Sequence, residues 1–352
     1  MTAAHRMALH RIPELDRVLP ETAEYLKTVL TPLGCTLFFP WESAVCAYFD
    51  YGRPETVAFR ADMDALPVCE ATGLPFASEH AGKMHACGHD GHMAILLALA
   101  EHLARVRMRQ TRNVLLIFQP AEETTGGAHA LCECGILEKH HVTRIYGLHL
   151  WPELAKGTVA ACAGSQMARS CELTVEIEGK SAHIAHWRDG NDALYAASRV
   201  LDRAYRLAEG KTCILRFGRL ESGTVRNAVS AHSRLEGSLR CFDDTLFHTL
   251  CAGLDALAAE ISRETGCTVR VACSDGYPPM NNDPALLAQA RESFPIAEAV
   301  PSYTTDDFSE YECRVPGVYF FLGTGGPALH TPEFDFDMSV LDTGLALFCS
   351  LL

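Results

Sequence analysis

A nine-residue stretch, Met84-His-Ala-Cys-Gly-His-Asp-Gly-His92, gathers three histidines and one cysteine directly before an apolar run that can form a helix. Imidazole nitrogen and thiolate sulfur are donors that zinc prefers, and a cysteine beside a histidine can also act as a nucleophile. Cys87 and His89 are two residues apart, so in extended chain both can reach one metal or two adjacent ones. A polar turn is the alternative, and this stretch alone does not exclude it.

Further donors follow apolar runs later in the chain, and they are Glu122, Glu123, His149 and His330. The carboxyl ends of parallel strands meet at one edge of a sheet, where α/β proteins place their ligand crevices. Each residue taken singly could be a helix-start acid or a core or surface histidine. Five donors are thus available, which exceeds what one structural zinc needs and suits a two-metal hydrolytic site. They are Cys87, His89, Glu123, His149 and His330.

The elements that must position these donors alternate between strand and helix. Near-continuous apolar runs at 113–118 and 317–322 are typical of strands buried on both faces. Apolar residues at helical spacing also predict a first helix over Pro13–Leu30. This alternation predicts the α/β class, with a largely parallel central sheet flanked by helices.

The pattern changes near residue 167. A strand of alternating apolar and charged residues at 171–178 is followed by a helix, two strands, a helix and a strand up to 272. The order βαββαβ is that of a ferredoxin-like α+β module. We therefore expect a discontinuous catalytic domain formed by residues 1–166 and 278–352, with residues 167–277 as an inserted domain.

Composition narrows the classes of partner and compartment. The chain has 352 residues, with 30 basic and 44 acidic side chains and a formal charge of −14, which argues against nucleic-acid and anionic-membrane partners. Fifteen cysteines without a small-domain framework favour reduced thiols and a cytoplasmic protein. We find no signal-peptide core at the start and no apolar run of roughly 18 residues, and we expect a soluble protein.

Seven stretches give the chain a family resemblance. It resembles the amidohydrolase branch of the dinuclear-metal aminoacylase and glutamate carboxypeptidase family, which includes hippurate hydrolase and the indoleacetyl-amino-acid hydrolases. The matching stretches run in the family's order from near the first residue to near the last, and they are Leu9–Leu15, Arg60–Pro67, Met84–His92, Phe118–Glu123, Gly147–His149, Asp307–Phe308 and Leu329–Asp337.

The resemblance assigns roles to the clustered residues. It implies two divalent metal ions per subunit and a general base at Glu122. Asp62 and Asp64 look like acids that support the site, although both could be turn or strand-end acids. A thiolate ligand favours zinc, with manganese, cobalt or nickel as alternatives. The implied metal ligands are Cys87, His89, Glu123, His149 and His330.

The family's inserted domain acts as a lid and dimerisation domain, so the resemblance implies a homodimer. His183 matches the histidine that reaches a substrate carbonyl, often across the dimer. Asn227 and Arg240 resemble positions that contact substrate. A turn asparagine and a solvated strand arginine are the structural alternatives for these two.

Three departures from the family's pattern concern the rim around the substrate. Trp187-Arg188 replaces a usual Pro-His, Asn227-Ala-Val-Ser230 replaces an Asn-Val-Ile-Pro-like turn, and Asp306 replaces a common Glu. The implied ligand set is intact, so the reaction type should carry over more safely than the substrate.

The expected function is metal-dependent hydrolysis of the amide bond in N-acyl amino acids or similar small amides and dipeptides. Glu122 would accept a proton from water and return it to the leaving amine, while His183 and one metal stabilise the oxyanion. Two alternatives stay open. The first is a cysteine hydrolase with Cys87 as nucleophile and His89 or His92 as base, and the second is a non-catalytic binder of a small acylated metabolite.

Overall fold

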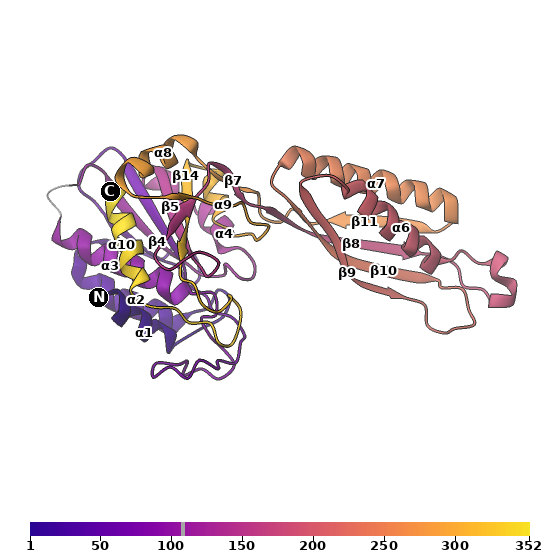
Figure 1. Ribbon diagram of the computed structural model, residues 1–352, viewed down its shortest axis with the longest axis horizontal. Helices are drawn as coiled ribbons and strands as arrows, with labels where there is room; N and C mark the ends of the chain where they lie inside the picture. The colour runs from indigo at the N-terminus through magenta and orange to yellow at the C-terminus, as the bar shows by residue number, and fades with distance from the viewer. Residues whose placement is uncertain (107–109) are drawn as a thin grey trace. The chain divides into compact units, whose positions relative to one another are not determined.

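The computed structural model describes residues 1–106 and 110–352, which form two compact units (Figure 1). The first unit contains Met1–Gln166, Asn281–Val300 and Asp306–Leu352. The second contains Met167–Met280 and also Pro301–Thr305. The second unit therefore interrupts the first along the chain, and a short later segment also belongs to it.

An eight-stranded sheet forms the centre of the first unit. Its four middle strands run parallel, while β2 pairs antiparallel with β4 and β6 pairs antiparallel with β14. In order across the sheet, the strands are β1 (Thr36–Phe38), β2 (Val45–Phe49), β4 (Asn113–Gln119), β3 (Thr56–Asp62), β5 (Val142–Trp151), β14 (Gly317–Gly323), β6 (Val159–Ala161) and β13 (Ala297–Glu298). A smaller two-stranded sheet joins β7 (Gly164–Met167) and β12 (Met280–Asn282).

The middle strands are parallel because helical crossovers connect them and cover their apolar side chains. Every residue of β3, β4 and β14 is buried. The apolar helix α3 packs on β3 and is joined there by α1 and α10. The predicted α/β class with a largely parallel central sheet is confirmed.

Helices of the first unit begin and end close to turn signals in the sequence. They are α1 (Thr2–His10), α2 (Pro20–Leu30), the 3₁₀ helix η1 (Thr31–Leu33), α3 (His89–Arg105), α4 (Gly127–Glu133), α5 (Ile136–Lys139), α8 (Pro284–Ser293), α9 (Ser309–Glu312) and α10 (Val340–Ser350). No helix among the described residues is long and apolar enough to cross a lipid bilayer.

The helix predicted over Pro13–Leu30 is wrong at its start. Asp16 has a φ of 65°, a left-handed conformation that interrupts a right-handed helix, and α2 begins only at Pro20. The Glu14 carboxylate instead accepts a hydrogen bond of 2.9 Å from the Thr22 N–H in the first turn of α2. Proline and an acid can precede a helix as readily as begin it.

The second unit has the predicted ferredoxin-like order, βαββαβ. Its sheet is antiparallel in the order β11-β8-β10-β9, and α6 and α7 pack on each other and on one face of it (Figure 1). Along the chain the elements are β8 (Arg169–Glu178), the 3₁₀ helix η3 (Ile184–Asp189), α6 (Ala193–Ala208), β9 (Cys213–Ser222), β10 (His232–Cys241), α7 (Asp244–Thr265) and β11 (Thr268–Cys273).

Candidate metal centre

The carboxyl edge of the large sheet carries most of the donors singled out from the sequence. β3 ends at Asp62, β4 ends three residues before Glu122, and His149 lies near the end of β5. Cys87 lies just before α3, where Gly88 has a φ of 87°. A Cβ atom at Gly88 would lie 2.9 Å from Leu150 Cδ1, so this turn requires glycine on both counts.

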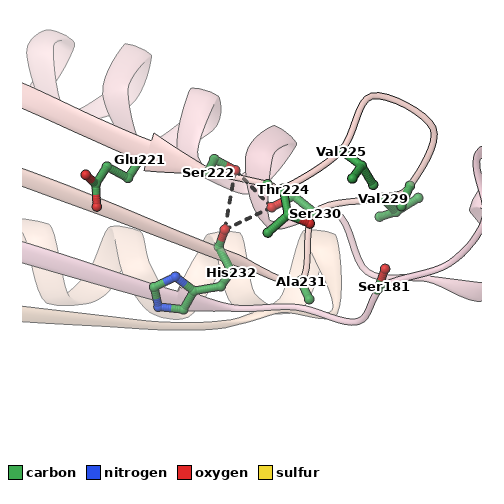
Figure 2. Close-up of a pocket in the computed structure, with 11 residues that line it drawn as sticks. Ser181, Glu221, Ser222, Thr224, Val225, Val229, Ser230, Ala231 and His232 are labelled. Carbon is green, nitrogen blue, oxygen red and sulfur yellow. Dashed lines mark hydrogen bonds between the residues drawn. The ribbon is translucent and has the colours of Figure 1, made fainter.

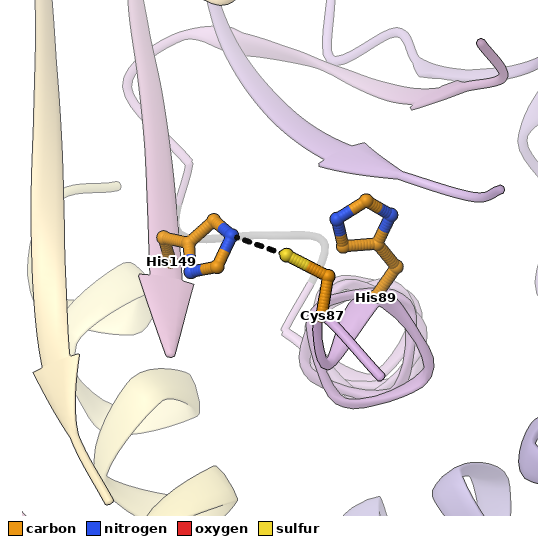
Figure 3. A group of neighbouring side chains, drawn as sticks. All are labelled: Cys87, His89 and His149. Carbon is orange, nitrogen blue, oxygen red and sulfur yellow. Dashed lines mark hydrogen bonds between the residues drawn. The ribbon is translucent and has the colours of Figure 1, made fainter. Parts of the chain in front are cut away.

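The five residues implied as metal ligands converge in one cluster. Cys87 Sγ lies 3.3 Å from His149 Nε2 and 3.3 Å from His330 Nε2. Glu123 Oε1 lies 3.2 Å from His330 Nε2 and 4.0 Å from His89 Nε2. Figure 3 shows the Cys87 sulfur between the imidazoles of His89 and His149. Donor atoms within 4.8 Å of one another form two groups that share Cys87, namely Cys87–His89–His149 and Cys87–Glu123–His330.

Two of the histidines are held in the tautomer that a metal requires. His89 Nδ1 donates a hydrogen bond of 2.8 Å to the Asp64 carbonyl, and His149 Nδ1 donates one of 2.7 Å to the Leu150 carbonyl. A neutral imidazole then presents the lone pair of Nε2 to the cluster. His89 Nε2 is buried and has no hydrogen-bond partner among the described residues. An orphaned buried acceptor beside a thiol and a carboxylate fits a divalent metal such as zinc.

Cys87 is poorly placed to be a nucleophile in its own right. Burial raises the pKa of its thiol well above the usual range, and the charges of Glu123 and Glu122 raise it further. His92 is not available as its base, because Nδ1 contacts Asp62 Oδ1 at 2.6 Å and Nε2 accepts 3.0 Å from the Leu150 N–H. A cation can hold this sulfur as thiolate, so the geometry favours a metal ligand over the cysteine hydrolase.

Asp64 holds the backbone of the acidic pair. One of its carboxylate oxygens accepts a hydrogen bond of 3.0 Å from the Glu122 N–H, and the other accepts one of 3.0 Å from the Glu123 N–H. Glu122 Oε2 lies 4.0 Å from His89 Nε2, beside the ligand cluster. Burial raises the pKa of Glu122 well above its usual range, and the charge of Asp306 raises it further. Divalent cations beside this carboxyl group would oppose both effects.

Sequence reasoning gave no role to Arg60, although its side chain supports the whole edge. The guanidinium is 1% exposed and also lies 3.4 Å from Asp306 Oδ1. Burial alone would lower the pKa of Arg60, but the charges of Asp306, Asp62 and Asp307 outweigh burial and raise it. An arginine inside an apolar strand was the available signal, since a buried charge needs partners. It donates to three side chains, Gln119 Oε1 at 2.9 Å, Asp62 Oδ2 at 2.7 Å and Asp307 Oδ1 at 2.6 Å.

In the second unit, His183 and Asn227 lie side by side on the surface. The two segments meet through a bridge between His183 and Ala228, and the Ile184 N–H donates 2.9 Å to the Asn227 carbonyl. The Ala185 N–H donates 3.2 Å to His183 Nδ1. When the imidazole is neutral, its proton is therefore on Nε2, which can donate to a substrate oxygen.

Arg240 lies at the opposite end of the module's sheet from His183. It is opposite Ser170 on β8, whereas His232 at the other end of β10 is opposite Glu178. Eight residues of strand separate His232 from Arg240, which is roughly 26 Å. The structure thus joins two of the module's three candidates and separates the third.

A pocket of about 410 Å³ adjoins the Asn227 loop in the second unit (Figure 2). Ser230 donates 2.9 Å to the His232 carbonyl, and the Ser222 hydroxyl lies 2.9 Å from the Ser230 oxygen, to which it can donate. The His232 imidazole contacts Glu176 instead, at 2.9 Å. These hydroxyls bond to one another and to a carbonyl rather than to a base, so the pocket has no activated nucleophile among the described residues.

Comparison with known proteins agrees with this geometry. Residues 58–352 match the description of peptidase family M20/M25/M40. The chain belongs to this family. Membership in M20/M25/M40 confirms the family resemblance and makes the protein an amidohydrolase, a hydrolase of carbon–nitrogen amide bonds.

Individual M20/M25/M40 relatives cover almost the whole chain. N-acetyldiaminopimelate deacetylase from Streptococcus pneumoniae (strain CGSP14) is 33% identical over 367 aligned positions, covering 99% of this chain and 96% of the relative. The enzyme of that name from Streptococcus uberis is 34% identical, covering 97% and 95%. The Bacillus subtilis YXEP protein, described as a dinuclear metal binding peptidase from the M20 family, is 29% identical with a TM-score of 0.90, covering 99% and 96%.

Proposed function

We propose that this M20/M25/M40 member is a metal-dependent hydrolase of N-acyl amino acids. One observation carries the proposal: His89 and His149 direct their Nε2 lone pairs into a cluster that contains Cys87, and the Nε2 of His89 has no partner among the described residues. The two groups of donors, Cys87–His89–His149 and Cys87–Glu123–His330, could hold two divalent ions. The ligand set is Cys87, His89, Glu123, His149 and His330. Zinc is the first choice, with manganese, cobalt and nickel as alternatives.

Glu122 is the general base and acid in this proposal. Divalent cations held at the cluster supply Lewis-acid chemistry, since they polarise a carbonyl and make a water more acidic. The Glu122 carboxylate accepts the proton of the attacking water and then gives it to the leaving amine. Asp64 holds the Glu122 backbone in place, and Asp62 connects His92 with Arg60 behind the cluster.

His183 and Arg240 are the proposed substrate contacts of the second unit, together with Asn227. His183 donates Nε2–H to the carbonyl oxygen as negative charge develops there. Arg240 binds the substrate carboxylate. Its guanidinium is partly buried and, among the described residues, shows no ion pair, unlike the paired arginines elsewhere on the open face of this sheet.

The placement of these two contacts at opposite ends of the module supports a homodimer. An N-acyl amino acid is about as long as two residues of extended chain, roughly 7 Å. His183 lies beyond the His232 end of the module's sheet and Arg240 at its other end, and roughly 26 Å of strand separates His232 from Arg240, so one module does not bring both side chains to the same small substrate. We infer that the metal centre of one subunit receives His183 from a second copy of the chain.

The names of the relatives support a substrate class. Curated relatives are named for the deacetylation of N-acetyldiaminopimelate, an N-acyl amino acid with more than one carboxylate. An acidic protein needs a local cation to bind such an anion, and Arg240 supplies one. We therefore propose short N-acyl derivatives of amino acids as substrates, with N-acetyldiaminopimelate first.

Metal analysis and a substrate panel test the proposal. Purified protein should contain about two divalent ions per chain, lose amide hydrolysis in chelator and recover it with added metal. The panel contains N-acetyldiaminopimelate, other N-acyl amino acids and dipeptides, with Glu122→Ala as the inactive control. Activity that survives chelation but not thiol alkylation would overturn the metal assignment. Tight binding without product across the panel would indicate a non-catalytic binder.

A mixing experiment tests the role of the second copy. Glu122→Ala and His183→Ala proteins are each inactive or weak, and they are mixed under conditions that allow subunits to exchange. If His183 acts across the dimer, each mixed dimer has one complete site, and an equimolar mixture regains about a quarter of wild-type activity. If His183 serves its own subunit, no mixed dimer has a complete site and activity does not return.

A further inference from the structure

Five cysteines meet at one end of the second unit's core, remote in sequence from the metal ligands. They belong to one apolar cluster between the sheet and the helices, although the chain's fifteen cysteines are otherwise scattered. Four come from different strands and one from α7. The five are Cys171, Cys213, Cys241, Cys251 and Cys273.

Three of these thiols form a row through the central member, Cys273. Its thiol interacts with those of Cys171 and Cys251 closely enough to shift the pKa of each. Cys273 is opposite Leu173 on β8, so Cys171 is its diagonal neighbour on the same face of the sheet. The second pair, Cys213 and Cys241, are directly opposite each other on β9 and β10.

The row runs from the surface into the core. Cys251 and Cys273 are partly exposed, whereas Cys171 is 1% exposed. The hydrogen bond from Cys273, opposed by burial and helped by Ser274, lowers the pKa of Cys171 to about 7. The bond to Cys171 in turn raises the pKa of Cys273. The lowered pKa favours the nucleophilic thiolate of Cys171, which as a thiol donates to the Glu172 carbonyl at 3.3 Å, while the raised pKa keeps the proton on Cys273.

We propose that Cys171 and Cys273 form a dithiol that hydrogen peroxide oxidises to a disulfide. The Cys171 sulfur attacks one peroxide oxygen, and the O–O bond breaks. Hydroxide departs as the leaving group, and Cys171 becomes a sulfenic acid. The Cys273 sulfur then attacks the Cys171 sulfur, and the sulfenic oxygen departs as water with the thiol proton. In total two thiols lose two electrons, and one peroxide becomes two water molecules.

Closure of this disulfide requires a small movement at the end of β11. Diagonal neighbours on adjacent strands are about 7–8 Å apart at Cα, and a disulfide needs about 7 Å or less. Cys273 is the last residue of β11, and residues 274–279 after it have no helix or strand. Cys251 gives the disulfide a second route, because it can exchange with Cys171 for the Cys273 sulfur.

Peptide mapping of the full-length wild-type protein tests the proposal. Reduced protein is titrated with hydrogen peroxide, alkylated, digested without reductant and analysed by mass spectrometry. We expect a cross-link from Cys273 to Cys171 or Cys251, with a loss of two hydrogens that dithiothreitol reverses. It should form at about tenfold lower peroxide than oxidation of the exposed Cys69 and Cys313, because the thiolate is the form of cysteine that peroxide oxidises.

Two variants provide a matched comparison. Cys273→Ser should abolish the cross-link, whereas Cys267→Ser should not, because Cys267 is buried in the module's other core cluster. The proposal is overturned if wild-type Cys171 and Cys273 stay reduced while Cys69 and Cys313 are oxidised. Conversion of Cys171 to sulfinic acid without any cross-link would also overturn it. Neither of these outcomes depends on how well a variant folds.

Discussion

Charged side chains are held in opposite ways at the carboxyl edge of the large sheet and on the open face of the module's sheet. At the edge, Arg60 and Asp62 are 1% and 0% exposed and belong to one closed network. On the open face, Arg219 and Glu236 are 58% and 34% exposed and pair in solvent. Removing one partner from a buried network costs about 3–5 kcal/mol, whereas an exposed pair contributes about 0–1 kcal/mol.

This difference in the burial of charged groups fits two separate tasks in the proposed mechanism, chemistry at the edge and substrate contact on the module. At the edge, Asp62 and the backbone of Glu122 are held in place before any substrate arrives, because Asp62 is tied to Arg60 and the Glu122 N–H to Asp64, both buried. On the module's face, charged side chains can be replaced at little cost in stability, because their pairs are exposed to solvent. His183, Asn227 and Arg240 lie on this face or beside it, with exposed or half-exposed side chains. Substitutions at the edge should therefore lower kcat, while those on the module should mainly weaken contacts with the substrate.

Glu122→Gln provides the strongest test of the edge. The amide cannot accept the proton of water, so we expect kcat to fall on the order of 10³-fold with metal content unchanged. The measurement is kcat together with metal analysis. Glu133→Gln, an exposed acid on α4, is the matched control. Near-normal turnover in Glu122→Gln would remove this residue from the mechanism.

His183→Ala tests whether the module takes part in the chemistry. Loss of one donor to the developing oxyanion should lower kcat/KM about 10²–10³-fold. His186→Ala changes another exposed histidine of the same 3₁₀ turn and should stay within about twofold of wild type. Equal activity of the two variants would mean that His183 takes no part in the chemistry.

Arg240→Met should raise KM about tenfold to a hundredfold and leave kcat nearly unchanged, because a charged hydrogen bond to the substrate carboxylate is lost. Arg270→Met is the control, since Arg270 lies on the same sheet and is paired with Glu178 at 3.0 Å. Steady-state kinetics with a neutral amide analogue sharpen the result: the KM difference should vanish when the substrate has no carboxylate.

His10→Gln should have the smallest effect, and the effect is on stability. Burial disfavours the charged ring, but the charge and hydrogen bond of Asp90 outweigh it and raise the pKa of His10. A raised folded pKa gives stability that is complete below about pH 6.5 and is lost as pH rises through the folded value. Urea unfolding at pH 6 and pH 9 should show a loss on the order of 1 kcal/mol in wild type.

The variant isolates this effect from other titrations. His10→Gln should lack that loss, whereas His129→Gln, at an exposed position, should keep it. An identical dependence on pH in all three proteins would mean that the His10–Asp90 contact, 2.7 Å in the structure, does not stabilise the fold through charge.

Much of the edge was predictable because its information is local. Long apolar runs mark buried strands, and the donors follow directly where those runs stop. The predicted strands at 113–118 and 317–322 are each within one residue of β4 and β14. What escaped prediction depends on partners distant in sequence. α1 is only nine residues long and is anchored by Arg6 and His10 on Asp90, about eighty residues later.

The same limit applied to Arg60 and to the module. A lone arginine in a strand indicates that acids must be near, but Asp307 lies 247 positions away and no local pattern points to it. The separation of His183 from Arg240 depends on the register of β8 against β10, which sequence spacing does not reveal.

The fixed tautomers of His89 and His149 determine which protons leave when a metal arrives. Their Nδ1 protons stay with the backbone carbonyls, so neither neutral ring releases a proton as Nε2 binds. Cys87 and His330 differ, because burial raises the pKa of the thiol and the hydrogen bond to Glu123 raises that of the imidazole. Metal uptake should therefore displace protons from these two side chains and from Glu122, whose pKa burial raises and nearby cations would lower. Calorimetry in buffers of different ionisation enthalpy would count them, and affinity should weaken as solutions become more acidic.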